Sequence, residues 1–128
     1  MVTRSRLRIA ILIPVVVGIG LLARRLPGLT GDAAGGLLYA TLLYLLAAFV
    51  APRARALSLV TATAAVGVLI ELLQLTGVPA VLGNAWPSAR LVFGSTFAPL
   101  DLAWAVAGAA LGALTDLVSR KRNAHQGR

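Results

Sequence analysis

Four long apolar runs, separated by short polar or basic junctions, constrain this chain more than any other feature of its sequence. The runs cover residues 7–23, 33–50, 56–76 and 99–119. A helix needs about 20 mainly apolar residues, with a range of roughly 17–25, to cross the hydrocarbon core of a bilayer. Backbone groups in lipid must be hydrogen-bonded within their own segment, which favours helices. The sequence therefore predicts an all-α integral membrane bundle of four transmembrane helices, in a single domain over residues 1–128.

The composition agrees with a membrane protein and excludes several functions. Hydrophobic residues make up 59% of the chain and charged residues 12%, whereas soluble domains average about 45–50% and about 25%. The net charge of +8 does not indicate nucleic-acid binding, because no basic face interleaved with aromatic residues accompanies it. The chain has no cysteine and a single histidine, His125, in a polar tail. We therefore expect no metal site and no cofactor.

The Lys and Arg residues predict the orientation, because cytoplasmic loops carry an excess of them. Nine of the twelve lie on one side of the predicted spans and three on the other. The larger group is Arg4, Arg6, Arg8, Arg53, Arg55, Arg120, Lys121, Arg122 and Arg128. The smaller group is Arg24, Arg25 and Arg90. We expect both termini, including a basic tail over residues 120–128, to be cytoplasmic in a multi-pass protein of the inner (plasma) membrane.

The first span also has the basic start and apolar middle of a secretory signal peptide. Arg24 and Arg25 follow the apolar run directly, and no A-x-A-like cleavage site is evident. These features favour a retained transmembrane span.

Five polar residues form the candidate binding site at the predicted outer end of the bundle. Ionisable residues within transmembrane segments are costly and mark functional sites by default. The five are Asp32, Glu71, Gln74, Arg90 and Asp101. Four of them lie near the outer end of a predicted span and Arg90 lies in the long third connection, so we expect all five to share an outward-facing pocket. Asp116, the remaining acid, lies at the opposite end with Arg120 as its expected i,i+4 partner.

Small residues at helical spacing are the candidates for helix packing. Gly67 lies four residues from both Thr63 and Glu71, which places all three on one face. Gly108 and Gly112 have the G-x-x-x-G spacing that lets membrane helices approach closely. Their contacts are expected either within one chain or between copies. Trp104 is compatible with a lipid-facing position.

These elements together resemble a small uncharacterised bacterial integral membrane family, domain of unknown function 2809. The matching positions, in family order, are Gly31-Asp32, Glu71 and Gln74, Arg90, Gly94 and Phe97, Asp101-Leu102, and Gly108 and Gly112. A more distant resemblance is to VanZ-like proteins, which usually carry Asn where this chain has Ala105. The resemblance implies a membrane fold and candidate residues, but no reaction.

The sequence favours a non-catalytic or accessory protein that binds a polar lipid headgroup or an envelope precursor at its outer leaflet. Arginine suits phosphate because its planar fork donates two parallel hydrogen bonds. Membrane lipids are the expected partners, with a homo-oligomer or a larger membrane complex as a further expectation. One alternative is an intramembrane acid/base enzyme that uses Glu71 and Asp101 on a lipid-linked substrate. Others are a small transporter subunit, and a scaffold in which these carboxylates merely pair with Arg90.

Overall fold

The computed structural model describes residues 3–93 and 99–126, and the side chains of all of these except 99 and 119–126. This part of the chain contains helices and no strand. The helices are α1 (Arg6–Ala23), α2 (Gly28–Val50), α3 (Ala56–Leu75), α4 (Val78–Ala85), α5 (Ala89–Phe93) and α6 (Pro99–Gln126).

Four of these helices are long and apolar enough to cross a membrane: α1, α2, α3 and the Leu100–Val118 part of α6. This confirms the predicted all-α bundle of four membrane-length helices. Large apolar side chains such as Leu22, Leu57 and Leu69 are more than half exposed. Such a surface suits lipid and would be unfavourable in water.

The predicted boundaries agree closely for α1 and α3, and differ at one end of α2 and of α6. Helix α2 begins at Gly28 rather than at residue 33, directly after Pro27. Helix α6 continues to Gln126 and so includes most of the predicted basic tail. Apolarity marks the part of a helix that lies in lipid. A helix can continue beyond that part into polar residues, and hydropathy does not indicate where it ends.

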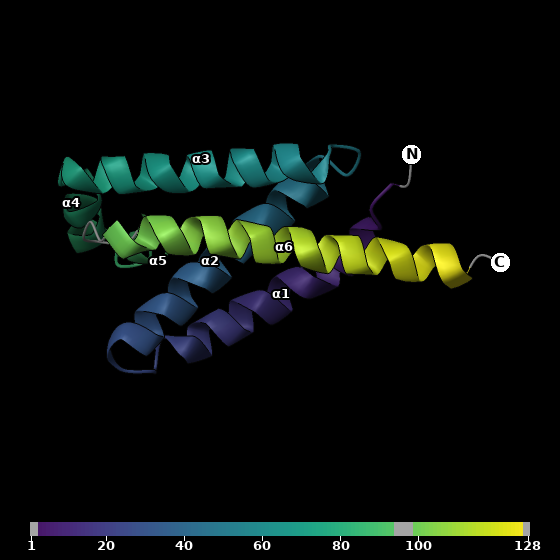
Figure 1. The fold of residues 1–128 in the computed structure, drawn as a ribbon. Coiled ribbons are helices and arrows are strands. Elements are labelled where there is room, and N and C mark those ends of the chain that lie inside the picture. The colour runs from purple at the N-terminus through teal and green to yellow at the C-terminus, as the bar shows by residue number, and fades with distance from the viewer. Residues whose placement is uncertain (1–2, 94–98, 127–128) are drawn as a thin grey trace.

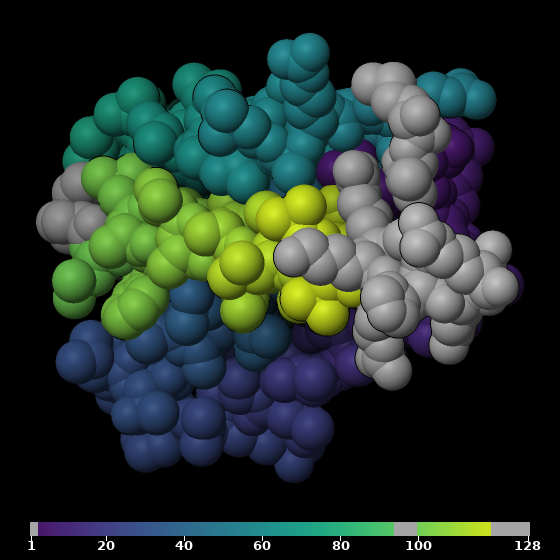
Figure 2. Space-filling model, turned by 45° about the vertical axis from the view of Figure 1, so that its right-hand side comes forward, coloured from purple at the N-terminus to yellow at the C-terminus, as the bar shows by residue number. Residues whose placement is uncertain are grey.

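The helices form three layers (Figure 1). Helix α6 packs against both α2 and α3, and α1 packs against α2. Figure 2 shows these layers on one face, with α6 in green and yellow between α3 in teal and the α1–α2 pair in blue and purple. The start of α1, the end of α6 and the α2–α3 connection lie at one end, called the terminal end. The α1–α2 turn, α4 and α5 lie at the other, called the α4–α5 end.

The third connection contains two short helices where the sequence suggested a loop. Gly77 adopts a left-handed conformation with φ of 76°, which glycine accepts without a steric penalty and which ends α3. Proline in the first turn of α4 then starts the next helix at little cost, because the first N–H groups have no partner within the helix. Gly94 and Phe97, which belong to the family pattern, lie outside the described residues.

Helices α2 and α6 run parallel and meet at small residues spaced one turn apart. A Cβ atom on Gly36 would lie 2.8 Å from the Cβ of Trp104. One on Gly108 would lie 2.6 Å from the Cβ of Ala40, and one on Gly112 would lie 2.8 Å from the ring of Tyr44. Glycine therefore sets the distance between these two helices, which is the packing mode expected of small residues in membranes.

The apolar core lies toward the terminal end of the bundle. Its buried members come from α1, α2 and α3 and are Ile9, Tyr44, Leu45, Ala48 and Leu59. Tyr44 is fully buried. The α4–α5 end lacks such a cluster among the described residues, and there the helices leave space between them.

Candidate functional site

A cavity of about 800 Å³ lies between the helices toward the α4–α5 end. Residues from α1, α2, α3, α5 and α6 line it. All five residues of the candidate binding site are among them, namely Asp32, Glu71, Gln74, Arg90 and Asp101. Ligand pockets typically enclose about 300–1,000 Å³, so the cavity is large enough for a small molecule or for part of a lipid.

Helix α3 contributes one continuous wall of the cavity. Thr63, Gly67, Glu71 and Gln74 all line it, as their shared helical face requires. Glu71 is 6% exposed. A Cβ atom on Gly67 would lie 2.9 Å from the Cβ of Ala105 on α6. Because Gly67 has no side chain, α3 and α6 can approach each other closely on this side of the cavity.

Arg90 enters the cavity wall from α5 and contacts α4. Its Nη2 donates a hydrogen bond to Asn84 Oδ1 at 2.6 Å. Its aliphatic part lies over Gly83, where an added Cβ would come within 2.5 Å of Arg90 Cγ. Within residues 3–93 and 99–126, the partner shown for the Arg90 guanidinium is Asn84, and no ion pair with Asp101 is found there.

Two side chains attach α5 to the neighbouring helices. The Tyr39 hydroxyl on α2 donates to the Val92 carbonyl at 2.5 Å, and Gln74 Nε2 on α3 donates to the Phe93 carbonyl at 2.6 Å. Val92 and Phe93 also line the cavity. These bonds hold α5 as a bridge between α2 and α3 at this end of the bundle.

Three polar atoms in the cavity wall are buried without a hydrogen-bond partner in the described part of the chain. They are Thr63 Oγ1, Gln74 Oε1 and Trp104 Nε1. Leaving a buried donor or acceptor unsatisfied costs about 1–3 kcal/mol. Buried polar atoms that lack protein partners usually have water or a ligand as partner.

The position of Trp104 differs from the sequence expectation. Trp104 was compatible with a lipid-facing position, but its side chain packs against Gly36 and lines the cavity. Spacing within α6 could not reveal this, because the space for the indole ring is made by a glycine on another helix. Gly83 and Asn84, which hold Arg90, were missed for the same reason.

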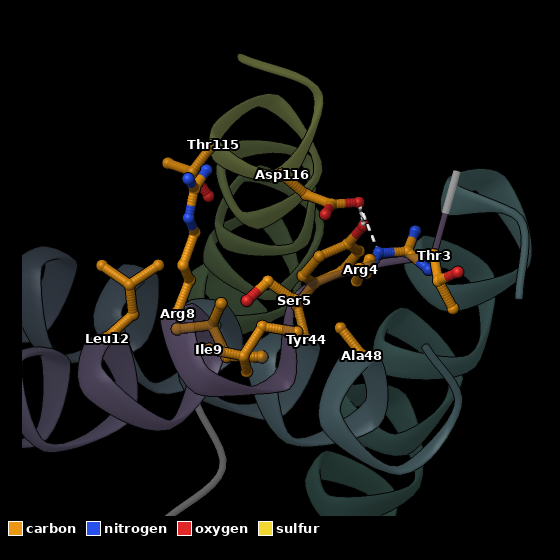
Figure 3. A pocket seen from close by; sticks show the side chains of 11 residues that line it. Thr3, Arg4, Ser5, Arg8, Ile9, Leu12, Tyr44, Ala48, Thr115 and Asp116 are labelled. Atoms are coloured by element: carbon orange, nitrogen blue, oxygen red, sulfur yellow. Dashed lines mark hydrogen bonds and ion pairs between the residues drawn. The ribbon is translucent and has the colours of Figure 1, made fainter. Parts of the chain in front are cut away.

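A second, much smaller cavity of about 30 Å³ lies at the terminal end (Figure 3). Beside it Arg4 Nε donates to Asp116 Oδ2 at 2.6 Å, and the Tyr44 hydroxyl donates to the same oxygen at 3.2 Å. Arg4 Nη1 also donates to the Ala54 carbonyl at 2.7 Å. The partner shown for Asp116 is therefore Arg4. The side chain of Arg120, the expected partner, lies outside the described side chains.

The four membrane-length helices and the cavity between them define a small polytopic membrane protein. The chain belongs to the family described as protein of unknown function DUF2809, which it matches over residues 25–109. This range contains all five candidate binding residues. No curated protein and no solved structure matches the chain.

Proposed function

We propose that this protein binds an amphiphilic ligand, a polar lipid or a lipid-linked envelope precursor, with its headgroup in the cavity at the α4–α5 end. The observation that carries the proposal is the composition of the cavity wall. Its polar members gather near the α4–α5 end, whereas apolar residues such as Val17, Leu42 and Leu46 line the remainder. A cavity with one polar and one apolar part matches the two parts of a lipid.

The two arginines in the cavity wall are the proposed contacts for a phosphate group. Arg24 follows α1 and Arg90 lies on α5, and both line the cavity. Both are exposed, so their guanidinium groups are accessible at the mouth of the cavity. The Arg90 guanidinium has five N–H donors. One of them forms the hydrogen bond to Asn84.

The orientation of the chain belongs to the same proposal. The terminal end carries most of the basic residues, which favours a cytoplasmic location. The mouth of the cavity would then face the outer leaflet of the plasma membrane.

Single cysteines test this orientation, because the natural chain has none. Ser88 and Ser5 are both exposed, and they lie at the α4–α5 end and the terminal end respectively. We expect a membrane-impermeant maleimide to label Ser88→Cys in intact cells and to label Ser5→Cys only after lysis. The opposite pattern would reverse the proposed orientation.

Ligand binding is tested by native mass spectrometry of protein extracted from membranes in a mild detergent. We expect wild type to retain lipid and Arg90→Ala to retain about tenfold less, because a charge-assisted hydrogen bond contributes roughly 1.5–3 kcal/mol. Arg53→Ala is the matched control, since Arg53 is exposed at the terminal end. Equal retention by all three proteins would contradict the proposal.

A further inference from the structure

The short helix α4 runs across the end of the bundle, whereas α3 and α6 run along it (Figure 1). It covers Val78–Ala85 and packs against α3 and α5. Because α4 lies beyond the layers formed by the long helices, one of its sides faces the surroundings of the protein.

This exposed side of α4 is apolar. Val78 and Val81 lie three residues apart on one helical face, and their side chains are 46% and 69% exposed. Trp86, which directly follows the helix, is 71% exposed. Pro79 and Gly83, on the opposite side, are buried. Exposed apolar surface of this kind marks contact with a membrane or with another protein.

The sequence around α4 favours lipid as its surroundings. No charged residue occurs from residue 72 to residue 89. Leu72 and Leu75 near the end of α3 are more than half exposed, as suits a helix that crosses a bilayer. Val78 and Val81 follow them along the chain with no charged side chain between. The lipid-facing apolar residues of α3 therefore continue into α4.

The length of α3 gives the depth of α4 in the membrane. Helix α3 has 20 residues and, at 1.5 Å per residue, is about 30 Å long. The hydrocarbon core of a bilayer is also about 30 Å thick. Two residues, Thr76 and Gly77, separate α3 from α4, so α4 begins where the hydrocarbon ends. Tryptophan and the apolar faces of helices parallel to the membrane are favoured at this level.

Helix α4 also positions Arg90. Asn84 Oδ1 accepts a hydrogen bond from Arg90 Nη2 at 2.6 Å, and the aliphatic part of Arg90 lies over Gly83. The depth of α4 in the membrane therefore determines the depth of the Arg90 guanidinium.

We propose that α4 and Trp86 form an interfacial anchor, which lies in the headgroup layer of the bilayer with its exposed apolar side chains in contact with lipid. This anchor holds Arg90 at the level of the lipid phosphates. The lipid surface covers the exposed side of α4, rather than a second copy of the chain or another protein. The anchor needs no ligand in the cavity, so it goes beyond the proposed function and does not depend on it.

Tryptophan fluorescence in phosphatidylcholine vesicles tests the depth of Trp86. The acyl chains carry bromine, a quencher, either near the headgroup or near the chain ends. The chain has two tryptophans, so Trp104→Phe leaves the emission of Trp86 alone. The difference between wild type and Trp86→Phe gives the same emission if Trp104→Phe fails to fold. We expect bromine near the headgroup to quench Trp86 about twofold more than bromine near the chain ends, and aqueous iodide to quench it weakly.

A charge on the exposed side of α4 tests the anchoring itself. Val81→Asp should move Trp86 toward water and raise its quenching by iodide about twofold, because a carboxylate is unfavourable at the edge of the hydrocarbon. Ser88→Asp is the matched control. It adds the same charge at the same end of the bundle but replaces an exposed polar side chain, so quenching should stay as in wild type.

Each other outcome overturns the anchor. Strong quenching by iodide without quenching by bromine places Trp86 in water. Protection from both quenchers places it against a second copy or another protein. Equal quenching in Val81→Asp and Ser88→Asp shows that the apolar side of α4 does not set its depth. Loss of lipid retention, measured separately by mass spectrometry, overturns the proposed function and leaves the anchor standing.

Discussion

Arg4 and Asp116 form a buried ion pair that joins the first residues of the chain to the last helix, with Arg4 Nε 2.6 Å from Asp116 Oδ2. Their side chains are 1% and 9% exposed. Arg4 also binds the Pro52 and Ala54 carbonyls in the α2–α3 connection. A single side chain thus links three parts of the terminal end.

Removing one partner of this pair is expected to destabilise the protein strongly. Asp116→Ala leaves the Arg4 guanidinium buried without its carboxylate, which costs about 3–5 kcal/mol when a buried pair is broken. Unfolding in mixed micelles with increasing dodecyl sulfate measures this free energy. The double variant Arg4→Met with Asp116→Leu should recover most of the loss, because it removes both charges. A double variant less stable than Asp116→Ala would contradict this account.

The glycines between α2 and α6 are expected to tolerate no side chain. In Gly108→Ala the new Cβ would lie 2.5 Å from the Leu37 carbonyl oxygen, and this backbone atom cannot move away cheaply. We expect a loss of about 1–3 kcal/mol, as for other overpacked sites. Gly18→Ala on α1 is the control, because nothing lies within 4 Å of the added Cβ. Equal unfolding free energies for the two variants would show that α2 and α6 are less closely packed.

Three threonines are expected to respond differently to replacement by valine. Thr63→Val should stabilise delipidated protein by about 1 kcal/mol, because it removes a buried hydroxyl that lacks a partner. Thr41→Val should destabilise by about 0.5–1.5 kcal/mol. The Thr41 hydroxyl is shared between the Leu37 carbonyl of its own helix at 2.8 Å and the Gly108 carbonyl across the interface at 3.1 Å, and valine removes both contacts. Thr61→Val is the control, since its exposed hydroxyl bonds within its own helix to the Leu57 carbonyl. A loss of stability in Thr63→Val would reveal a partner for this hydroxyl.

Releasing α5 is expected to expose its backbone to solvent. Tyr39→Phe removes the bond to the Val92 carbonyl, and Gln74→Leu removes the bond to the Phe93 carbonyl. Each hydrogen bond makes a net contribution of about 0.5–1.5 kcal/mol to stability. Hydrogen–deuterium exchange across residues 89–93 should therefore be about threefold to tenfold faster in either variant. Tyr44→Phe, which alters the terminal end, should leave this exchange unchanged. No change in any variant would mean that α5 is held by other contacts.

The class of fold followed from local properties of the sequence. The length and apolarity of the runs at residues 7–23, 33–50 and 56–76 reflect the thickness of a bilayer, which acts on each helix separately. The same holds for the face shared by Thr63, Gly67 and Glu71, since it depends only on the helical repeat. These features need no knowledge of neighbouring helices, and for that reason the sequence sufficed.

The partners of individual side chains were decided by the tertiary structure. Arg4 and Asp116 are more than a hundred residues apart in the sequence, and the space for Trp104 is made by Gly36 on another helix. The sequence placed Asp32, Glu71, Gln74, Arg90 and Asp101 at one end of the bundle, but only the packing of α2, α3 and α6 arranges them around a cavity. Spacing along one helix determines which way a residue faces. Which residues it contacts depends on the neighbouring helices, and these approach closely where glycine leaves space.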